Sequence, residues 1–172
     1  KEPVIFVLNH QSSFDCVLMG SFMDRNTTIV AKKQVKYIPF IGSYMWMIGA
    51  IFLDRGNKKK DISYIDQVVD TIQKRKVSVL IFPEGTRSHS PVPGLLPFKT
   101  GAFHMAVRAK IPIVPIVYGN YHHIFDEKNR IFRSGKIPCK VLPPISTSGT
   151  DGNPDSIEKL ANECRSKMLD VL

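Results

Sequence analysis

The sequence has 172 residues, which is the size of one compact domain and long enough to bury a core without disulfide or metal staples. Hydrophobic residues make up 43% of it and charged residues 23%, and these ordinary proportions exclude intrinsic disorder, collagen-like repeats and a coiled coil. The 24 lysines and arginines outnumber the 15 aspartates and glutamates, for a net charge of +9. We therefore expect an anionic partner: nucleic acid, a phospholipid surface or a phosphorylated small molecule.

In chain order, short β-rich runs alternate with helical patterns, which is typical of an α/β domain. Strands are expected over residues 4–8, 28–31, 51–53, 77–82 and 113–117, with a weaker candidate at 140–142. Helices are expected over residues 13–23, over 62–76, before Pro112, and over 157–171. The pattern predicts a single domain whose central sheet is mixed or largely parallel and is flanked by helices.

The longest apolar stretch is the uncharged run at residues 37–53. Its seventeen residues lie at the short end of what can span a membrane, and Pro39, Gly42 and Gly49 interrupt it. We interpret this run as a buried or membrane-dipping hairpin.

The first candidate site is the stretch Asn-His-Gln-Ser-Ser-Phe-Asp at residues 9–15, between the first expected strand and the first expected helix. If a turn intervenes, Asp15 can fold back onto His10, fix the imidazole tautomer and stabilise the imidazolium that forms when His10 takes a proton. The same residues also fit a capping box, in which Ser12 and Asp15 serve only the helix backbone. Taken alone, the stretch leaves both interpretations open.

The second candidate site is the end of the run at residues 79–88, at a strand end of the kind where doubly wound sheets bind ligands. Gly85 allows close approach of a ligand, Arg87 suits a phosphate, and Glu84 suits either Arg87 or a substrate hydroxyl. Taken alone, an ordinary turn with an exposed Glu84–Arg87 ion pair, worth about 0–1 kcal/mol, is the simpler interpretation. Residues 88–97, with three prolines, follow either as a flap over the site, which we favour, or as a passive connection.

A third, weaker cluster is basic and follows the apolar run. Arg55 is a second candidate phosphate ligand. Three lysines could extend the same basic surface toward a lipid headgroup or a nucleotide phosphate: Lys32, Lys33 and Lys36.

Several other motifs are missing from the sequence. It contains no G-x-S-x-G elbow, no G-x-x-x-x-G-K-[ST] loop, no G-x-G-x-x-G and no C-x-x-C pair. Serine hydrolysis, nucleoside triphosphate use, dinucleotide redox chemistry and zinc binding are therefore disfavoured.

Four stretches, in the same order, resemble the motifs of the glycerolipid acyltransferase family, most closely its 1-acylglycerol-3-phosphate acyltransferases. Residues 9–15 resemble the N-H-x-x-x-x-D catalytic motif, and the later blocks are residues 49–55, 82–88 and 111–116. The first motif alone is a weak signal, but its combination with the later Phe-Pro-Glu-Gly-Thr-Arg-Ser is specific. Residues after about Gly119 carry no motif of this kind.

The resemblance implies transfer of a fatty acyl group from acyl-CoA to the sn-2 hydroxyl of 1-acyl-glycerol-3-phosphate, giving phosphatidic acid and CoA. It implies that His10 is the general base, that Asp15 orients it, and that no covalent enzyme intermediate forms. The substrate-binding residues that it implies are Arg55, Glu84, Gly85, Thr86, Arg87 and Lys99. Acyl-CoA is expected as a co-substrate, with no bound cofactor and no metal site.

The resemblance also implies a membrane partner. The run at residues 37–53 would meet the membrane phospholipid surface so that a two-tailed product can leave sideways. We expect the intact protein in the endoplasmic reticulum membrane, with no nucleic-acid partner. Because the sequence opens at Lys1, we expect residues 1–172 to be the acyltransferase domain of a longer membrane protein whose N-terminal membrane segments are missing.

Two rival functions stay open. One is an acyl-CoA-dependent acyltransferase that acts on glycerol-3-phosphate or another lysophospholipid. The other is a non-catalytic module that binds anionic lipid or nucleic acid. Such a module needs no His10–Asp15 pair, and a nucleic-acid binder more often shows aromatic residues clustered beside its basic ones. The intact pair therefore favours an enzyme.

Overall fold

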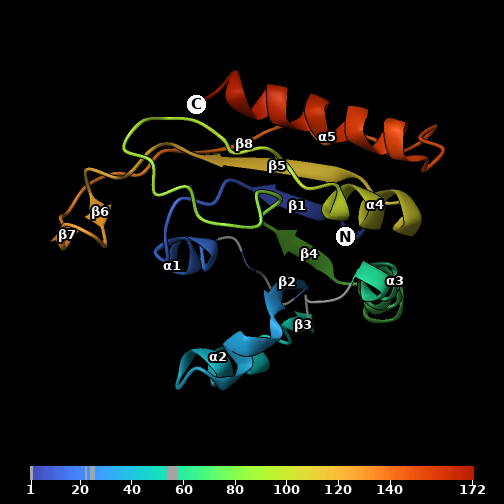
Figure 1. Cartoon of the computed structure of the whole chain (residues 1–172), viewed down its shortest axis with the longest axis horizontal. Helices are drawn as coiled ribbons and strands as arrows, with labels where there is room; N and C mark the ends of the chain where they lie inside the picture. Colours follow the sequence, from blue (N-terminus) through green and yellow to red (C-terminus); the bar gives the residue numbers. More distant parts are fainter. Residues whose placement is uncertain (1, 22, 24–25, 54–57) are drawn as a thin grey trace.

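A computed structural model describes residues 2–21, 23, 26–53 and 58–172, with the backbone alone for residues 58–63. Six strands form one sheet in the order β3-β2-β4-β1-β5-β8 (Figure 1). They are β1 (Ile5–Leu8), β2 (Thr27–Lys32), β3 (Ile51–Leu53), β4 (Ser78–Ile81), β5 (Ile113–Tyr118) and β8 (Cys139–Val141). All neighbouring strands pair in parallel except β8, which pairs antiparallel with β5. The predicted α/β fold with a largely parallel sheet is confirmed.

Helices connect these strands, and a small hairpin stands apart from the sheet. The helices are α1 (Asp15–Met19), the 3-10 helix η1 (Lys33–Tyr37), α2 (Ile41–Met47), α3 (Lys58–Arg75), α4 (Gly101–Ala109) and α5 (Pro154–Leu169). The hairpin pairs β6 (Phe125–Asp126) with β7 (Ile131–Phe132). Figure 1 shows α5 above the sheet and α2 below it.

The sheet separates two hydrophobic cores, because successive side chains of a strand point to opposite faces. Val7 of β1 and Ile81 of β4 belong to the larger core, which residues of α3, α4 and α5 complete. Leu8 and Leu80, each one position away, belong to the smaller core, which Met19 of α1 and a residue of α2 complete. The sheet is thus covered on both faces, as a parallel sheet must be.

The predicted helices are confirmed, with shifts of a few residues at their ends. The apolar stripe expected on the last helix is core, since it is buried in α5 at Ile157, Leu160, Cys164 and Met168. The helix expected over residues 13–23 is shorter, because α1 ends at Met19 and Gly20 follows as its C-cap. Glycine favours a helix end because it weakens a helix interior.

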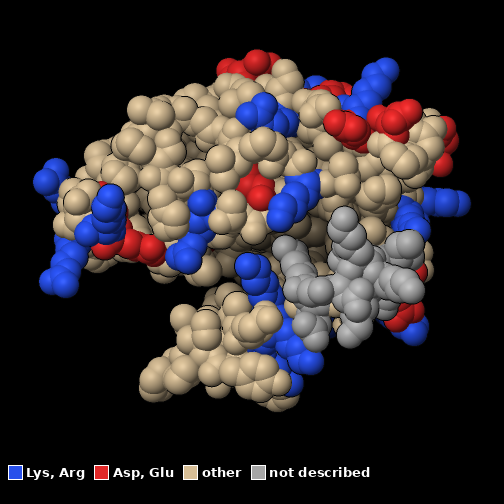
Figure 2. Space-filling view, in the orientation of Figure 1, with Lys and Arg blue, Asp and Glu red and all other residues tan. Residues whose placement is uncertain are grey.

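Of the two interpretations of residues 37–53, the buried hairpin is wrong, and the membrane-dipping segment stays a prediction. The run forms the end of η1, then α2 and β3, and the side chains of Phe40 and Trp46 are 89% and 69% exposed. In α2 the buried residues are Gly42 and Met45. The surface that α2 presents is almost free of charged side chains (Figure 2). No helix in the described residues is long and apolar enough to cross a membrane.

Candidate active site

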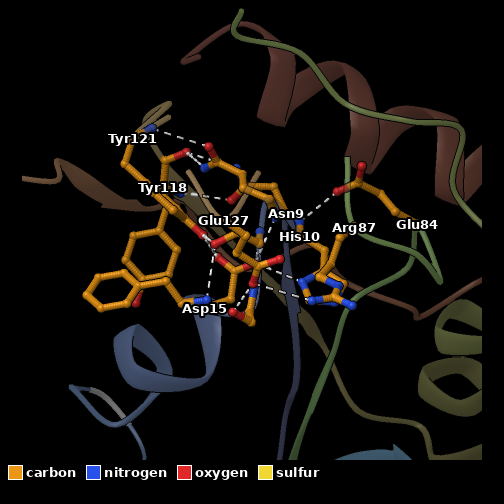
Figure 3. A network of polar contacts seen from close by, with 12 residues as sticks. Asn9, His10, Asp15, Glu84, Arg87, Tyr118, Tyr121 and Glu127 are labelled. Carbon is orange, nitrogen blue, oxygen red and sulfur yellow. Dashed lines mark hydrogen bonds and ion pairs between the residues drawn. The ribbon is translucent and has the colours of Figure 1, made fainter. Parts of the chain in front are cut away.

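Three loops meet at one edge of the sheet. They follow β1, β4 and β5, and because β1 lies between the other two and all three run parallel, the loops emerge side by side. Two backbone hydrogen bonds join the first two loops: Ser88 N–H donates to the His10 carbonyl at 2.9 Å, and His89 N–H donates to the Gln11 carbonyl at 3.0 Å. Figure 3 shows the polar side chains that these loops bring together.

The centre of this network is the Asp15 carboxylate, which is fully buried. Its Oδ2 lies 2.7 Å from His10 Nδ1 and accepts from the backbone N–H groups of Gln11 at 2.7 Å and Ser12 at 3.1 Å. Its Oδ1 accepts from the Tyr121 hydroxyl at 2.6 Å. These donors compensate the burial of a charged group that no lysine or arginine contacts among the described residues.

The contact with Asp15 fixes the state of the His10 ring. A carboxylate can only accept, so Nδ1 carries the proton and Nε2 presents its lone pair. In the described part of the chain Nε2 has no hydrogen-bond partner. The ring stacks on Phe82, with centroids 4.1 Å apart, and its side chain is 19% exposed. His10 is therefore held on one side and open to a substrate at the nitrogen that can take a proton.

The dyad and the helix cap, which the sequence left as alternatives, are both present. Ser12 Oγ accepts from the Phe14 N–H at 3.1 Å, and Asp15 accepts from the Ser12 N–H, as in a capping box. The same Asp15 oxygen also contacts His10. The cap thus positions the carboxylate that orients the imidazole.

Glu84 is buried, at 3% exposed, and both of its oxygens bind backbone groups. Oε1 accepts from the His10 N–H at 2.7 Å, and Oε2 accepts from the Leu96 N–H at 2.9 Å. Burial raises the pKa of the Glu84 carboxyl, and the two N–H donors act against this rise. Glu84 therefore anchors the His10 loop, while its predicted role in substrate binding stays a prediction.

Arg87 does not pair with Glu84, so the ion pair considered from the sequence is not formed. Its Nη1 lies 3.6 Å from Glu127 Oε1, and both side chains are substantially exposed. The same Glu127 oxygen accepts from the Ser13 backbone and hydroxyl. An exposed pair of this kind is worth about 0–1 kcal/mol, so an anionic substrate can displace Glu127 from Arg87.

Gly85 and Lys99, both predicted to bind substrate, lie against each other. Gly85 has a φ of +70°, a backbone conformation that favours glycine, and a Cβ added there would lie 2.8 Å from Lys99 Nζ. The Lys99 N–H donates to the Pro83 carbonyl at 2.8 Å, which fixes the lysine beside this turn. Thr86 is exposed next to it. The turn at residues 82–88 thus exposes its backbone, and the Lys99 ammonium group lies beside it.

The weaker basic cluster is only partly described. Arg55 lies outside the described residues. Lys32, Lys33 and Lys36 are exposed at the end of β2 and in η1, and β2 runs parallel to its neighbour β4. These lysines therefore lie at the same edge of the sheet as the dyad. The described residues contain no group of three histidines, cysteines, aspartates or glutamates that could hold a metal ion.

The proline-containing segment 88–97 is held at both ends. Near its start, Asn120 donates to the Ser90 carbonyl at 2.9 Å. Near its end, Arg165 of α5 donates to the carbonyls of Leu95 at 2.6 Å and Leu96 at 3.1 Å. The segment is thus tied to the loop after β5 and to α5, and its role as a flap stays a prediction.

Sequence reasoning missed the residues that support the dyad. The Asn9 side chain binds both backbone groups of Tyr118, accepting from the N–H at 2.9 Å and donating to the carbonyl at 2.8 Å. Gln11 Nε2 donates to the Tyr118 and Gly119 carbonyls at 3.1 Å. Asn9 and Gln11 lie inside the first motif, so their place there was a signal. Tyr121 follows the last recognised motif, and no local pattern marks it.

The chain is similar to known proteins in sequence and in fold. The family model described as Acyltransferase matches residues 1–119. The 1-acyl-sn-glycerol-3-phosphate acyltransferase of Saccharomyces cerevisiae is 38% identical over all of this chain and 56% of its own length, and the alpha form of Homo sapiens is 40% identical over 99% and 59%. In fold, the chain resembles the crystal structure of the 1-acyl-sn-glycerophosphate (LPA) acyltransferase PlsC from Thermotoga maritima. The TM-score is 0.76, at 24% identity over 99% of this chain and 66% of that one.

The match to the family model covers the loops after β1 and β4, including His10, Asp15 and the turn at residues 82–88, and it ends at Gly119, where the loop after β5 begins. The chain spans somewhat more than half the length of the curated relatives that it matches. These findings show that the chain belongs to the acyltransferase family.

Proposed function

We propose that the protein transfers a fatty acyl group from acyl-CoA to the sn-2 hydroxyl of 1-acyl-glycerol-3-phosphate, giving phosphatidic acid and CoA. The observation that carries this proposal is the His10–Asp15 pair, with Nδ1 on the buried carboxylate and Nε2 open. The relatives named as 1-acyl-sn-glycerol-3-phosphate acyltransferases support the choice of acceptor. The family resemblance supports acyl-CoA as the donor.

In this mechanism His10 acts on the acceptor hydroxyl. Nε2 takes the hydroxyl proton while the oxygen attacks the thioester carbonyl, and Asp15 stabilises the imidazolium that forms. The tetrahedral intermediate then collapses, the carbon–sulfur bond breaks, and the imidazolium returns the proton to the CoA sulfur. The hydroxyl proton thus ends on the CoA thiol and the acyl group on the acceptor oxygen, and no covalent enzyme intermediate forms. General-base assistance contributes about 10²–10⁴-fold, and positioning supplies a further part.

The acceptor phosphate binds beside the turn at residues 82–88. Arg87 exchanges its exposed pair with Glu127 for the phosphate, and Lys99 above Gly85 adds a second positive charge. The guanidinium fork matches two phosphate oxygens. Arg55 and Thr86 are proposed as further contacts, and Glu84 acts by holding the His10 loop in place.

A membrane surface is the proposed source of the lipid substrate. The exposed large apolar side chains of residues 37–47 include Phe40, Trp46 and Met47, and the lysines of η1 and β2 precede them in the chain. Apolar groups that enter the acyl boundary, flanked by cations that meet anionic headgroups, are typical of an interfacial helix. We place the protein in the endoplasmic reticulum membrane, in phospholipid and triacylglycerol biosynthesis.

The test compares acceptors. The full-length protein is given oleoyl-CoA with 1-acyl-glycerol-3-phosphate, glycerol-3-phosphate or lysophosphatidylcholine, and thiol release and lipid products are measured. We expect phosphatidic acid from the first acceptor, and a KM for it that rises about tenfold in Arg87→Ala, because an interaction with the phosphate is lost. Arg133→Ala, which removes another exposed arginine, is the matched control and leaves this KM unchanged.

Two other results would change the proposal. Preferential acylation of glycerol-3-phosphate or lysophosphatidylcholine would keep the mechanism and replace the acceptor. Lipid binding by the folded protein without thiol release from any pair of substrates would make it a non-catalytic lipid-binding module.

A further inference from the structure

Tyr121 contacts the dyad from a part of the chain that carries no recognised motif. Its hydroxyl lies 2.6 Å from Asp15 Oδ1, and its side chain is 1% exposed. It follows β5, whereas His10 lies in the loop between β1 and α1, and Asp15 is the first residue of α1. The contact therefore depends on the fold and not on the local sequence. In Figure 3, Tyr121 and Asp15 belong to the same hydrogen-bonded network.

The direction of the hydrogen bonds around Tyr121 is determined by its neighbours. Asp15 can only accept, so the phenolic hydrogen points to Oδ1. Ser12 Oγ lies 2.9 Å from the Tyr121 oxygen and accepts from the Phe14 N–H. Because the one phenolic hydrogen already goes to Asp15, the Ser12 hydroxyl donates to the Tyr121 oxygen. Burial and the nearby Asp15 raise the pKa of the Tyr121 phenol, which keeps it protonated as a donor.

The two oxygens of the Asp15 carboxylate therefore contact different side chains, Tyr121 and His10. Oδ1 is held by Tyr121, while Oδ2 receives His10 and two backbone N–H groups. Rotation of the carboxylate about its χ2 angle would break contacts on both sides. The tyrosine also draws negative charge toward Oδ1 and away from the oxygen that faces the imidazole.

We infer that Tyr121 is a positioning residue for the acyl transfer, which holds Asp15 in register with His10 and limits how strongly the carboxylate favours the imidazolium. The inference rests on the proposed function, in which His10 must be neutral to accept a proton. Without the phenolic donor, Asp15 attracts a proton on His10 more strongly, and a smaller fraction of the protein is in the reactive state at a given pH.

Other ionisable groups near Asp15 do not supply this effect. They come from the neighbouring elements: Cys16 on α1, Glu84 after β4 and Tyr118 on β5. Asp15 helps to raise the pKa of each of them, so none is a positive charge that competes with His10. In contrast to these three groups, the Tyr121 hydroxyl donates a hydrogen bond to the Asp15 carboxylate.

The test is Tyr121→Phe in the full-length protein, which keeps the ring and removes only the hydroxyl. We expect kcat to fall about tenfold with little change in either KM, and the acid limb of the kcat profile to move upward by about half a pH unit. A larger loss is not expected, because Tyr121 also lines a cavity of about 510 Å³ from which water can replace the hydroxyl. Tyr118→Phe is the control, since it removes a buried hydroxyl that donates to the Leu18 carbonyl at 2.8 Å.

A second readout does not require turnover. The titration of the His10 ring is followed by NMR in the wild type and in both variants. We expect its midpoint to move upward in Tyr121→Phe and to stay in place in Tyr118→Phe. This result would support the inference even if another acceptor or no acceptor were used, so it separates the inference from the proposed function. An unmoved midpoint in folded Tyr121→Phe, or an equal shift in Tyr118→Phe, would overturn it.

Discussion

The Asp15 carboxylate is surrounded by donors from four different residues: the His10 ring, the Gln11 and Ser12 backbones and the Tyr121 hydroxyl. Each donor fixes one direction of a group that is fully buried. The imidazole is thus held by a support that is itself rigid. Such a rigid support reduces the reorganisation needed when a proton reaches His10.

Asp15→Asn tests this support at the scale of one residue. The amide keeps the size of the carboxylate but removes the charge that stabilises the imidazolium, and its NH₂ group opposes one of the existing donors. We expect kcat to fall by about 10²–10⁴-fold, with a smaller effect on KM. Steady-state kinetics with both substrates measures this, and a kcat within twofold of the wild type would contradict the role given to Asp15.

The raised pKa of the Glu84 carboxyl predicts how the stability of the protein depends on pH. Burial raises the pKa of its carboxyl in the folded protein, so the folded state holds this proton more tightly than the unfolded state does. The stabilisation from that proton is present below the unfolded pKa and is lost as pH rises through the folded pKa. As the pH rises above the ordinary glutamate pKa of 4.5, the wild type should therefore lose stability relative to Glu84→Gln. Urea unfolding of both proteins at several pH values checks this, and a constant difference in the free energy of unfolding would refute it.

At the scale of elements, α2 is short and places large apolar side chains in solvent. The helix packs closely on η1, since Gly42 lies directly against the Lys36 backbone where no Cβ would fit. Phe40, before the helix, has a φ of +63°, a conformation that a bulky residue rarely adopts. The close packing and the unusual backbone hold the aromatic side chains away from the core.

Trp46 provides a direct probe of this element, because it is the one tryptophan of the sequence. We expect its fluorescence to shift to the blue and to be quenched by lipids brominated near the headgroup end of their chains, when vesicles contain phosphatidylcholine and phosphatidylserine. Met47→Glu should weaken the quenching, whereas Val141→Glu, at an exposed apolar residue of β8, should not. Unquenched Trp46 in the membrane-bound protein would show that α2 does not enter the lipid.

At the scale of the whole molecule, the parallel sheet explains how distant residues form one site. Loops after β4, β1 and β5 come together because these strands are neighbours, although β1 and β4 are separated in the chain by α1, β2, η1, α2, β3 and α3. The C-terminal helix α5 lies beyond the family-model match. It nevertheless covers the larger core and holds segment 88–97 through Arg165.

The packing of α5 predicts a stability effect that is separate from chemistry. Ile157 is fully buried against the larger core, so Ile157→Ala should lower the free energy of unfolding by about 2–5 kcal/mol. Lys159→Ala, on the exposed side of the same helix, should change it by less than about 0.5 kcal/mol. Chemical denaturation of both variants measures the difference. Equal stabilities would show that α5 does not contribute to the core as described.

Much of this architecture follows from the sequence, for identifiable reasons. Alternating strands and helices predict the sheet, and the motifs predict that His10 and Asp15 meet. Tyr121 could not be found in this way, because its contact with Asp15 joins residues 106 positions apart. The sequence could not decide whether residues 37–47 are buried or exposed, since an apolar run looks the same whether it faces a core or a membrane. Glu84 was recognised as important, but its bonds to the His10 and Leu96 backbones depend on the fold.

The role of His10 as general base can be tested directly by measuring thiol release. Thiol release from oleoyl-CoA is measured with and without 1-acyl-glycerol-3-phosphate, in the wild type, in His10→Ala and in the control His123→Ala, which alters an exposed histidine. We predict release by the wild type and the control only when the acceptor is present, and a loss of at least about 10²-fold in folded His10→Ala. Turnover by His10→Ala at the wild-type rate would show that His10 is not the general base.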